Sequence, residues 1–384
     1  MRENEKYFDK QDMYDILEGT MLLGCGGGGD RGFSQFFLEQ CILTMATCVK
    51  YIEPKEIELE YSSVFSLMGF PKQAQDMLLQ NGNLVDSIRN GIKNAYAAMK
   101  DAVGTSEISP ISVETGSFNV LTSILLSLCC GVPLVDGDYG GRSYPMLNMS
   151  TIAAAGADPS PLVITSACSN LQIKVSNDGN VEDIESICRN IICNNAFLVS
   201  AGPNEQAFGG IVALFPTKTD KIGDAIIANT ITHCRDIGRT LRENSKDPVE
   251  ALINKYHGYK LFQGKITKIE QTIIAGYCRG MVTIQNDVDT VFVEFLNENF
   301  LVWVKNKGVI AMAPDLICYI DQSGKAFSNN DLKENQDINI IGFKANPKLL
   351  ESGVLNSYQN AIEKYFGYFG AYTPIDKLNI EYQK

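Results

Sequence analysis

The chain has 384 residues, of which 45% are hydrophobic and 20% are charged, as in an ordinary globular protein with a substantial core. At roughly 150 residues per domain, this length predicts two or three domains. The formal net charge of -12 argues against nucleic acid or an anionic membrane as a partner, because both attract basic surfaces.

The composition also bears on the compartment. No apolar run is long enough to span a membrane, and the polar N-terminal stretch does not resemble a secretory signal. The eleven cysteines include no pair at Cys-x-x-Cys spacing, so we expect reduced thiols in a cytoplasmic protein. With only two histidines, a histidine-rich metal site is not expected.

A run of glycines separates the first two predicted helices. Asp12 is a candidate cap for a helix over residues 13–23, and a second helix is predicted over residues 33–45. Successive backbone N–H groups in such a run form a concavity that binds anions. No Lys-Ser/Thr pair follows and no strand precedes the run, so a nucleotide cofactor is not expected. The run consists of Gly26, Gly27, Gly28 and Gly29.

Cys25 stands directly before these glycines and is the one side chain of the run that is able to act as a nucleophile. Its thiolate would be favoured near the N-terminus of the following helix. The alternative is that Cys25 is only a small residue that fills a tight corner.

Three short apolar segments, residues 64–68, 111–113 and 132–135, predict buried strands that alternate with helices. This alternation predicts an N-terminal three-layer α/β domain over residues 1–165 with a largely parallel sheet. Each strand is followed by a polar turn that contains glycine, and turns at one edge of such a sheet meet in one cleft. The alternative for the last turn is an ordinary surface turn with an Asp–Arg pair. The side chains expected in the cleft are Glu114, Asn119, Asp136, Asp138 and Arg142.

The second domain is expected over residues 166–384. A helix is predicted over residues 220–242 with Asp220 as its cap, and His233 on it is expected to be packed or at the surface rather than catalytic. Short β-branched and aromatic runs over residues 258–345 predict a β-sandwich or a barrel-like subdomain. Two acidic residues border these strands and could face a cleft, although positions at the surface are expected: Glu298 and Asp315.

Several motifs along nearly the whole chain resemble one family. They are Leu23-Gly-Cys-Gly-Gly-Gly-Gly29, Asp136-Gly-Asp-Tyr-Gly-Gly-Arg142, Gly276-Tyr-Cys-Arg-Gly280, Asn297-Glu-Asn299 and Ala313-Pro-Asp-Leu-Ile317. They resemble the DUF917 family, also called the S-methyl thiohydantoin desulfurase family, which is associated with hydantoinase/oxoprolinase proteins. The resemblance implies an α/β domain joined to a β-rich domain, and removal of sulfur from thiohydantoin rings. Two departures stand out: Met146 replaces a glutamate of the family pattern, and Glu114-Thr-Gly-Ser117 replaces Glu-Ile-Gly-Gly.

The leading hypothesis is a cytoplasmic hydrolase that acts on a small cyclic amide or thioamide, such as a hydantoin or a thiohydantoin. Attack on the ring needs an activated nucleophile, a proton donor and a stabiliser of negative charge. Asp136 or Asp138 would activate water, and Cys25 is a covalent alternative. Arg142 would pair with a substrate carboxylate. The full set of candidates is Asp136, Asp138, Cys25 and Glu114 for catalysis, and Asn119, Arg142 and the amides of Gly26–Gly29 for substrate binding.

Two alternatives stay open. Met146 in place of a glutamate motivates a non-catalytic reading: a small-ligand-binding or accessory subunit of a hydantoinase/oxoprolinase-like system. Asp136, Asp138 and Glu114 would also suit a divalent metal ion, because Mg²⁺ and Mn²⁺ prefer oxygen ligands. The expected partners are a small-molecule substrate and either a second copy of the chain or a hydantoinase-like protein, without nucleic acid or membrane.

Overall fold

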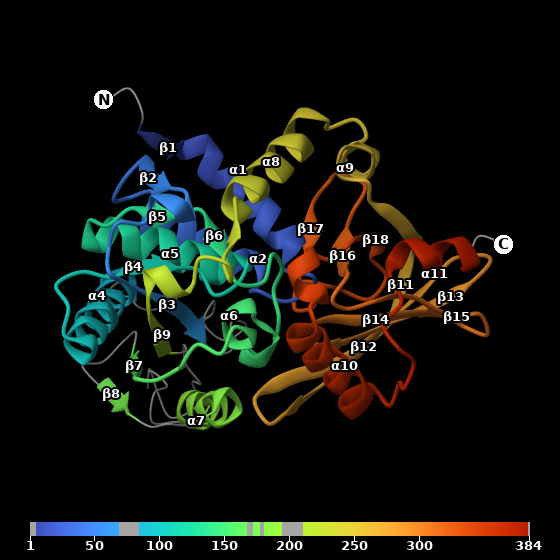
Figure 1. Ribbon diagram of the computed structural model, residues 1–384. Helices are drawn as coiled ribbons and strands as arrows, with labels where there is room; N and C mark the ends of the chain where they lie inside the picture. Colours follow the sequence, from blue (N-terminus) through green and yellow to red (C-terminus); the bar gives the residue numbers. More distant parts are fainter. Residues whose placement is uncertain (1–4, 69–83, 167–171, 177–179, 194–209, 383–384) are drawn as a thin grey trace, which may run out of the picture.

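The computed structural model describes residues 5–68, 84–166, 172–176, 180–193 and 210–382. The chain forms two parts that lie side by side in Figure 1: one built from the N-terminal sheets and their helices, and one built from the C-terminal strands. Within the described residues, no helix is both long and apolar enough to cross a membrane.

The first part contains most of the helices and several short sheets. Its elements up to residue 175 are β1 (Lys6–Asp9), α1 (Lys10–Leu23), α2 (Arg31–Phe36), the π-helical η1 (Phe37–Ile42), β2 (Cys48–Ile52), η2 (Pro54–Glu56), β3 (Tyr61–Met68), α4 (Leu84–Val103), β4 (Ser109–Ile111), α5 (Ser117–Cys130), β5 (Leu134–Val135), β6 (Gly137–Asp138), η3 (Leu147–Met149), α6 (Thr151–Ala154), β7 (Leu162–Ser166) and β8 (Gln172–Val175).

The next elements complete the first part and begin the second. They are α7 (Val181–Cys193), β9 (Gly210–Lys218), η4 (Thr219–Lys221), β10 (Ile227–Ala228), α8 (Thr230–Glu243), α9 (Pro248–Tyr256), β11 (Tyr259–Ile274), β12 (Tyr277–Gln285), β13 (Thr290–Leu296), β14 (Glu298–Val304), β15 (Gly308–Met312), β16 (Leu316–Ile320), β17 (Ala326–Phe327), β18 (Asp337–Phe343), η5 (Pro347–Leu350), α10 (Ser352–Phe366) and α11 (Ile375–Tyr382). The apolar run over residues 196–200, whose composition predicts a strand, lies outside the described residues.

The expected α/β class is confirmed, but the expectation of a largely parallel sheet is wrong. The five-stranded sheet has the order β4-β3-β9-β7-β8, and β9 pairs antiparallel with both β3 and β7. Parallel pairing in the described part of the chain is confined to β3 with β4 and β2 with β5. The reason is that β9 lies between β3 and β7 in the sheet although it follows β3 in the chain by about 145 residues. The local alternation of strands and helices in the sequence cannot show such an insertion.

Two helix starts also differ from the sequence-based expectation. Helix α1 is capped by Asp9, whose carboxylate accepts a hydrogen bond from the Asp12 N–H, so that Asp12 is the partner in the cap rather than the cap itself. Helix α8 begins at Thr230, well after Asp220, because η4 and β10 occupy the preceding residues.

Helices α1 and α8 pack closely along each other, as Figure 1 shows for the blue and yellow ribbons. Two glycines permit this approach: a Cβ atom on Gly19 would lie 2.0 Å from the Cys234 carbonyl oxygen, and one on Gly238 would lie 1.9 Å from the Asp15 carbonyl oxygen. The pair fixes the C-terminal end of α1, and the glycine run begins directly after that end.

The second part confirms the predicted β-rich region. Its eight strands form one antiparallel sheet in the order β15-β14-β13-β12-β11-β18-β16-β17, curled into a half-barrel rather than a sandwich. Its inner face is filled by apolar side chains such as Phe295, Val302 and Ile340. A further core cluster joins the two parts, because Tyr144 and Ile111 of the first pack in one cluster with Phe300 and Tyr358 of the second. The division at residues 165 and 166 stays a prediction.

Candidate active site

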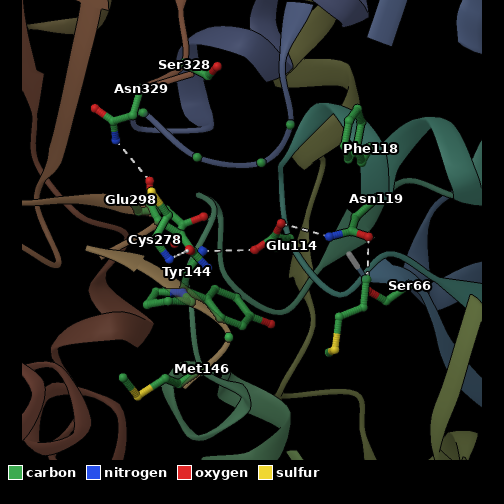
Figure 2. Close-up of a pocket in the computed structure, with 18 of the residues that line it drawn as sticks. Ser66, Glu114, Phe118, Asn119, Tyr144, Met146, Cys278, Glu298, Ser328 and Asn329 are labelled. Atoms are coloured by element: carbon green, nitrogen blue, oxygen red, sulfur yellow. Dashed lines mark hydrogen bonds between the residues drawn. The ribbon is translucent and has the colours of Figure 1, made fainter. Parts of the chain in front are cut away.

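A cavity of about 480 Å³ lies where the two parts of the chain meet. The first part contributes the glycine run, the end of β3, the turn between β4 and α5, the segment Tyr144–Leu147 and one face of α7. The second part contributes the tip of the β11–β12 hairpin, the β13–β14 turn and residues 328–330. Figure 2 shows the polar side chains that face this space.

The glycine run lines the cavity, and its role in substrate binding stays a prediction. The backbone of the run has positive φ angles: 86° at Gly26, 71° at Gly28 and 119° at Gly29. Glycine adopts such values without strain. The preceding Cys25 also has a positive φ angle, of 49°. The carbonyls of the run hold it in place: the Asn329 N–H donates to Gly26 and the Phe118 N–H donates to Gly28. In the described part of the chain, the N–H groups of Gly26, Gly28 and Gly29 find no such partner, which leaves them for a ligand.

Glu114 lies in the turn that leads into α5 and is almost fully buried in the cavity wall. The Tyr144 N–H donates to its Oε2 at 2.9 Å, and the Asn119 side-chain amide donates to its Oε1 at 2.8 Å. Burial raises the pKa of Glu114 to about 7, despite these hydrogen bonds and the nearby Arg142 charge. A carboxyl group with a pKa near neutrality is suited to proton transfer.

Asn119, the second predicted binding residue in this wall, holds Glu114 in place. Its Oδ1 accepts hydrogen bonds from the Ser66 hydroxyl and the Leu67 N–H, both at the end of β3. These contacts fix the orientation of its amide, so the Nδ2 group must face Glu114. The predicted meeting of the β3 end with the Glu114 turn is therefore confirmed.

Glu298 is the main residue that the sequence-based expectation misplaced. It was expected at the surface, but it is 3% exposed, it lines the cavity, and its Oε2 has no hydrogen-bond partner among the described residues. Burial raises its pKa well above the usual value, and the charge of Glu114 adds to this effect. Figure 2 labels the Glu114 and Glu298 side chains among those that line the cavity.

The only local feature of the sequence around Glu298 is the polar triplet Asn297-Glu-Asn299, which interrupts two largely apolar runs but does not by itself indicate burial. In the structure, Asn297 alone lies between β13 and β14, and Glu298 begins β14. Asn297 takes a φ angle of 57°, and its side chain accepts a hydrogen bond from the Cys278 N–H. This tight turn points Glu298 inward against the glycine run. Asp315, the other acidic residue expected at the surface, is also buried and accepts hydrogen bonds from the N–H groups of Ala345 and Ile375.

The two aspartates expected in the cleft lie outside its lining, so this part of the predicted convergence is wrong. Asp136 caps α8: it accepts hydrogen bonds from the Ile231 and Thr232 N–H groups at 2.9 and 3.0 Å, and from the Thr232 hydroxyl. Asp138 accepts hydrogen bonds from the Thr115 hydroxyl and, at 2.9 Å, from the Gly141 N–H. Both carboxylates therefore hold the backbone in place.

Arg142 is also absent from the lining and is fully buried. Its guanidinium donates to four backbone carbonyls, those of Ser143, Asn299, Pro314 and Asp315, at 2.8 to 3.3 Å. Its donors face away from any ligand in the cavity, so the expected pairing with a substrate carboxylate is not supported. Arg142 instead joins the first part of the chain to the second.

Cys25 is fully buried behind the glycine run and does not line the cavity either. Burial raises the pKa of this thiol, but a hydrogen bond with the Cys318 thiol and the charge of Arg142 outweigh that effect and lower it to about 7. Cys25 therefore fills a tight corner beside a positive charge. Its role as a nucleophile stays a prediction.

The expected metal site is not supported by the placement of its ligands. Glu114 lines the cavity, whereas Asp136 and Asp138 are engaged with α8 and with the Gly141 backbone. Over the described ranges, no three His, Cys, Asp or Glu side chains are grouped to hold a metal ion.

Residues 11–174 match the family model for the S-Me-THD-like N-terminal domain, and residues 204–375 match that for the S-Me-THD-like C-terminal domain. A crystal structure of a protein from Chromobacterium violaceum has a similar fold, with a TM-score of 0.78, 23% sequence identity, and coverage of 97% of this chain and 100% of that chain. No curated protein matches the chain.

Proposed function

Because the chain belongs to the S-Me-THD-like family, we propose that it is a hydrolase that removes sulfur from a small thiohydantoin-like ring. The observation that carries the proposal is the pair of buried carboxyl groups, Glu114 and Glu298, in one cavity beside a glycine run. The cavity volume of about 480 Å³ is in the range that holds a small cyclic molecule.

Hydrolysis at the ring carbon that bears sulfur needs two proton transfers. Water attacks this carbon, a base takes a proton from the water, and the carbon–sulfur bond breaks as the sulfur receives a proton. The products are a hydantoin and either hydrogen sulfide or methanethiol. Glu114, with its pKa near 7, is the group proposed to take the proton from water.

Glu298 is proposed to protonate the leaving sulfur. Burial raises its pKa well above the usual value, which favours the protonated form, and its Oε2 has no partner among the described residues. Two neighbouring carboxyl groups with different environments divide the acid and base roles in this way in many hydrolases. The N–H groups of Gly28 and Gly29, for which the described residues provide no backbone partner, are proposed to stabilise negative charge on the ring during attack.

The proposal is tested by incubating the purified protein with 2-thiohydantoin, S-methyl thiohydantoin and hydantoin, while sulfide, methanethiol and ring opening are followed. We expect sulfide or methanethiol from at least one of the first two. Glu114→Gln and Glu298→Gln should each lower kcat about 100-fold or more, because each removes one proton transfer. Absence of turnover with all three compounds would overturn the proposal.

A binding role without catalysis is the second candidate, and Met146 favours it because this residue places a thioether in the cavity wall at a position where the family pattern has a glutamate. In that case the protein would bind the ring unchanged. Calorimetric binding of S-methyl thiohydantoin without release of methanethiol, followed by turnover in Met146→Glu, would establish this candidate.

A further inference from the structure

Ser143 lies between two residues that already have a place in the site. The preceding Arg142 joins the two parts of the chain, and the N–H of the following Tyr144 donates to Oε2 of Glu114 at 2.9 Å. Backbone hydrogen bonds also hold Ser143 itself. Its N–H donates to the Leu23 carbonyl at 3.1 Å, and its carbonyl accepts from Nε of Arg142 at 2.9 Å. The position of the Ser143 side chain is therefore set by the surrounding backbone.

The fully buried Ser143 hydroxyl occupies a slot that two glycines keep open. A Cβ atom on Gly28 or on Gly116 would lie 2.5 Å from Oγ of Ser143, closer than real Cβ contacts. The same Cβ atom on Gly116 would lie 2.7 Å from Oε1 of Glu114. The hydroxyl and this carboxyl oxygen are therefore neighbours beside the Gly116 backbone, next to Gly28 of the glycine run.

Glu114 has room for one more donor. Its Oε2 accepts from the Tyr144 N–H and its Oε1 from the Asn119 amide, and Figure 2 shows both hydrogen bonds as dashed lines. Each oxygen of a carboxylate accepts up to two hydrogen bonds, so Oε1 is able to accept from Ser143 as well. The Ser143 hydroxyl is near enough to lower the pKa of Glu114, against the effect of burial. In the part of the chain that the structure describes, this hydroxyl has no other partner.

We propose that Ser143 is a positioning residue for Glu114: its hydroxyl donates to Oε1 when this carboxyl is deprotonated, and so holds the carboxylate in place in the cavity wall. The protonated form gains less from this donor, because a hydrogen bond to a charged acceptor is about twice as strong as one between neutral groups. Ser143 therefore favours the form of Glu114 that is able to accept a proton. The kinetic test of this proposal rests on the proposed function, in which Glu114 is the base.

Other titratable groups also face Glu114, from several elements around it. The positive charge among them stabilises the deprotonated form, whereas the acidic neighbours disfavour it. Ser143→Ala leaves all of these groups in place and removes one neutral donor, so a changed titration of Glu114 in this variant reports the loss of the hydroxyl. The groups are Arg142 and Tyr144 on either side of Ser143, Asp138 of β6, Glu298 of β14, Cys25 before the glycine run and Tyr358 of α10.

The titration of Glu114 is followed in the full chain without substrate, by nuclear magnetic resonance of carbon-labelled glutamate carboxyl groups. Glu114→Gln identifies the signal by its loss. In Ser143→Ala the midpoint of about 7 should move up by about one pH unit, because a hydrogen bond to a charged group is lost. The matched control is Ser127→Ala, which removes a buried hydroxyl at the far end of α5 that donates to the Val132 carbonyl, and it should leave the midpoint unchanged. An unmoved midpoint in Ser143→Ala, or an equal shift in both variants, overturns the proposal.

Turnover of S-methyl thiohydantoin gives a second readout. In Ser143→Ala the rise of kcat/KM with pH should move up by the same amount, so that kcat/KM falls about fivefold at pH 7 and returns to within about twofold of the natural plateau well above the new midpoint. A loss of kcat/KM at every pH with an unmoved midpoint would show a merely structural role and overturn the proposal. If the natural protein does not turn over the ring, only the hydrolase proposal fails, and the titration of Glu114 alone decides the role of Ser143.

Discussion

Two buried acids, Glu114 and Asp138, illustrate how position decides what a carboxyl group does. Burial raises the pKa of Glu114 and of Asp138 to about 7 in both cases. Asp138 accepts hydrogen bonds from Thr115 and Gly141 outside the cavity lining, whereas Glu114 faces the cavity beside Glu298. Similar pKa values therefore accompany a structural role in one residue and a candidate catalytic role in the other.

The pKa of Glu114 gives a prediction for stability. Below pH 4.5 this carboxyl is protonated in both the folded and the unfolded chain, so its contribution to stability is fully present. Between pH 4.5 and about 7 the unfolded chain releases the proton and the folded chain keeps it, so stability falls as pH rises. Glu114→Gln removes this dependence, and its urea midpoint should fall less between pH 5 and pH 8 than that of the natural protein.

The same residue predicts a pH dependence of activity. As a base, Glu114 must be deprotonated, so kcat/KM should rise with pH through about 7 and level off above it. Asp136→Asn is the matched control: Asp136 caps α8 outside the cavity, and this variant should lose stability but keep the shape of the pH profile. A profile that does not change between pH 5 and 8 would contradict the base role.

The glycine run shows how one element depends on a distant one. A Cβ atom on Gly27 would lie 2.0 Å from Oε1 of Glu298, closer than any real contact, so the run and the β13–β14 turn must fit each other. Gly27→Ala should therefore displace Glu298, lower kcat strongly and destabilise the fold by about 1–3 kcal/mol. Gly223→Ala is the control, because nothing lies within 4 Å of a Cβ atom there. Activity assays and urea unfolding of both variants give the comparison.

Most individual elements could be predicted from the sequence, because their signals are local. The strands of the β-rich part and α5 follow from short-range patterns of apolar residues. The pairing of β9 between β3 and β7 could not be predicted, since it joins residues far apart in the chain. For the same reason Glu298 was missed and Asp136 was misplaced: the partner of each, Gly27 or α8, lies far away in sequence.

At the scale of the whole molecule, Arg142 connects the two parts of the chain. Its four carbonyl partners include three from the second part, and one guanidinium satisfies all of them. Removing the donors would leave these buried carbonyls without partners. The placement of Glu298 opposite Glu114 depends on the same junction, because Asn299 follows Glu298 directly.

Arg142→Met should therefore destabilise the whole protein by about 3–5 kcal/mol, as expected for loss of a buried charged hydrogen-bonding group. Urea unfolding followed by the fluorescence of the one tryptophan, Trp303, and by circular dichroism should show one shared transition at a lower midpoint. Arg239→Met is the control: Arg239 is 41% exposed and pairs with Asp12, so its loss should cost less than about 1 kcal/mol. Equal midpoints for the two variants would contradict the junction role.

The insertion of β9 into the middle of the five-stranded sheet has a consequence for synthesis of the protein. On the ribosome, β3 and β7 emerge long before residues 210–218, and until then they have no strand between them to bind. The sheet cannot close before more than half of the polypeptide has left the exit tunnel. Nascent chains of this protein therefore carry open strand edges for an extended time, and in that interval they are the natural clients of chaperones.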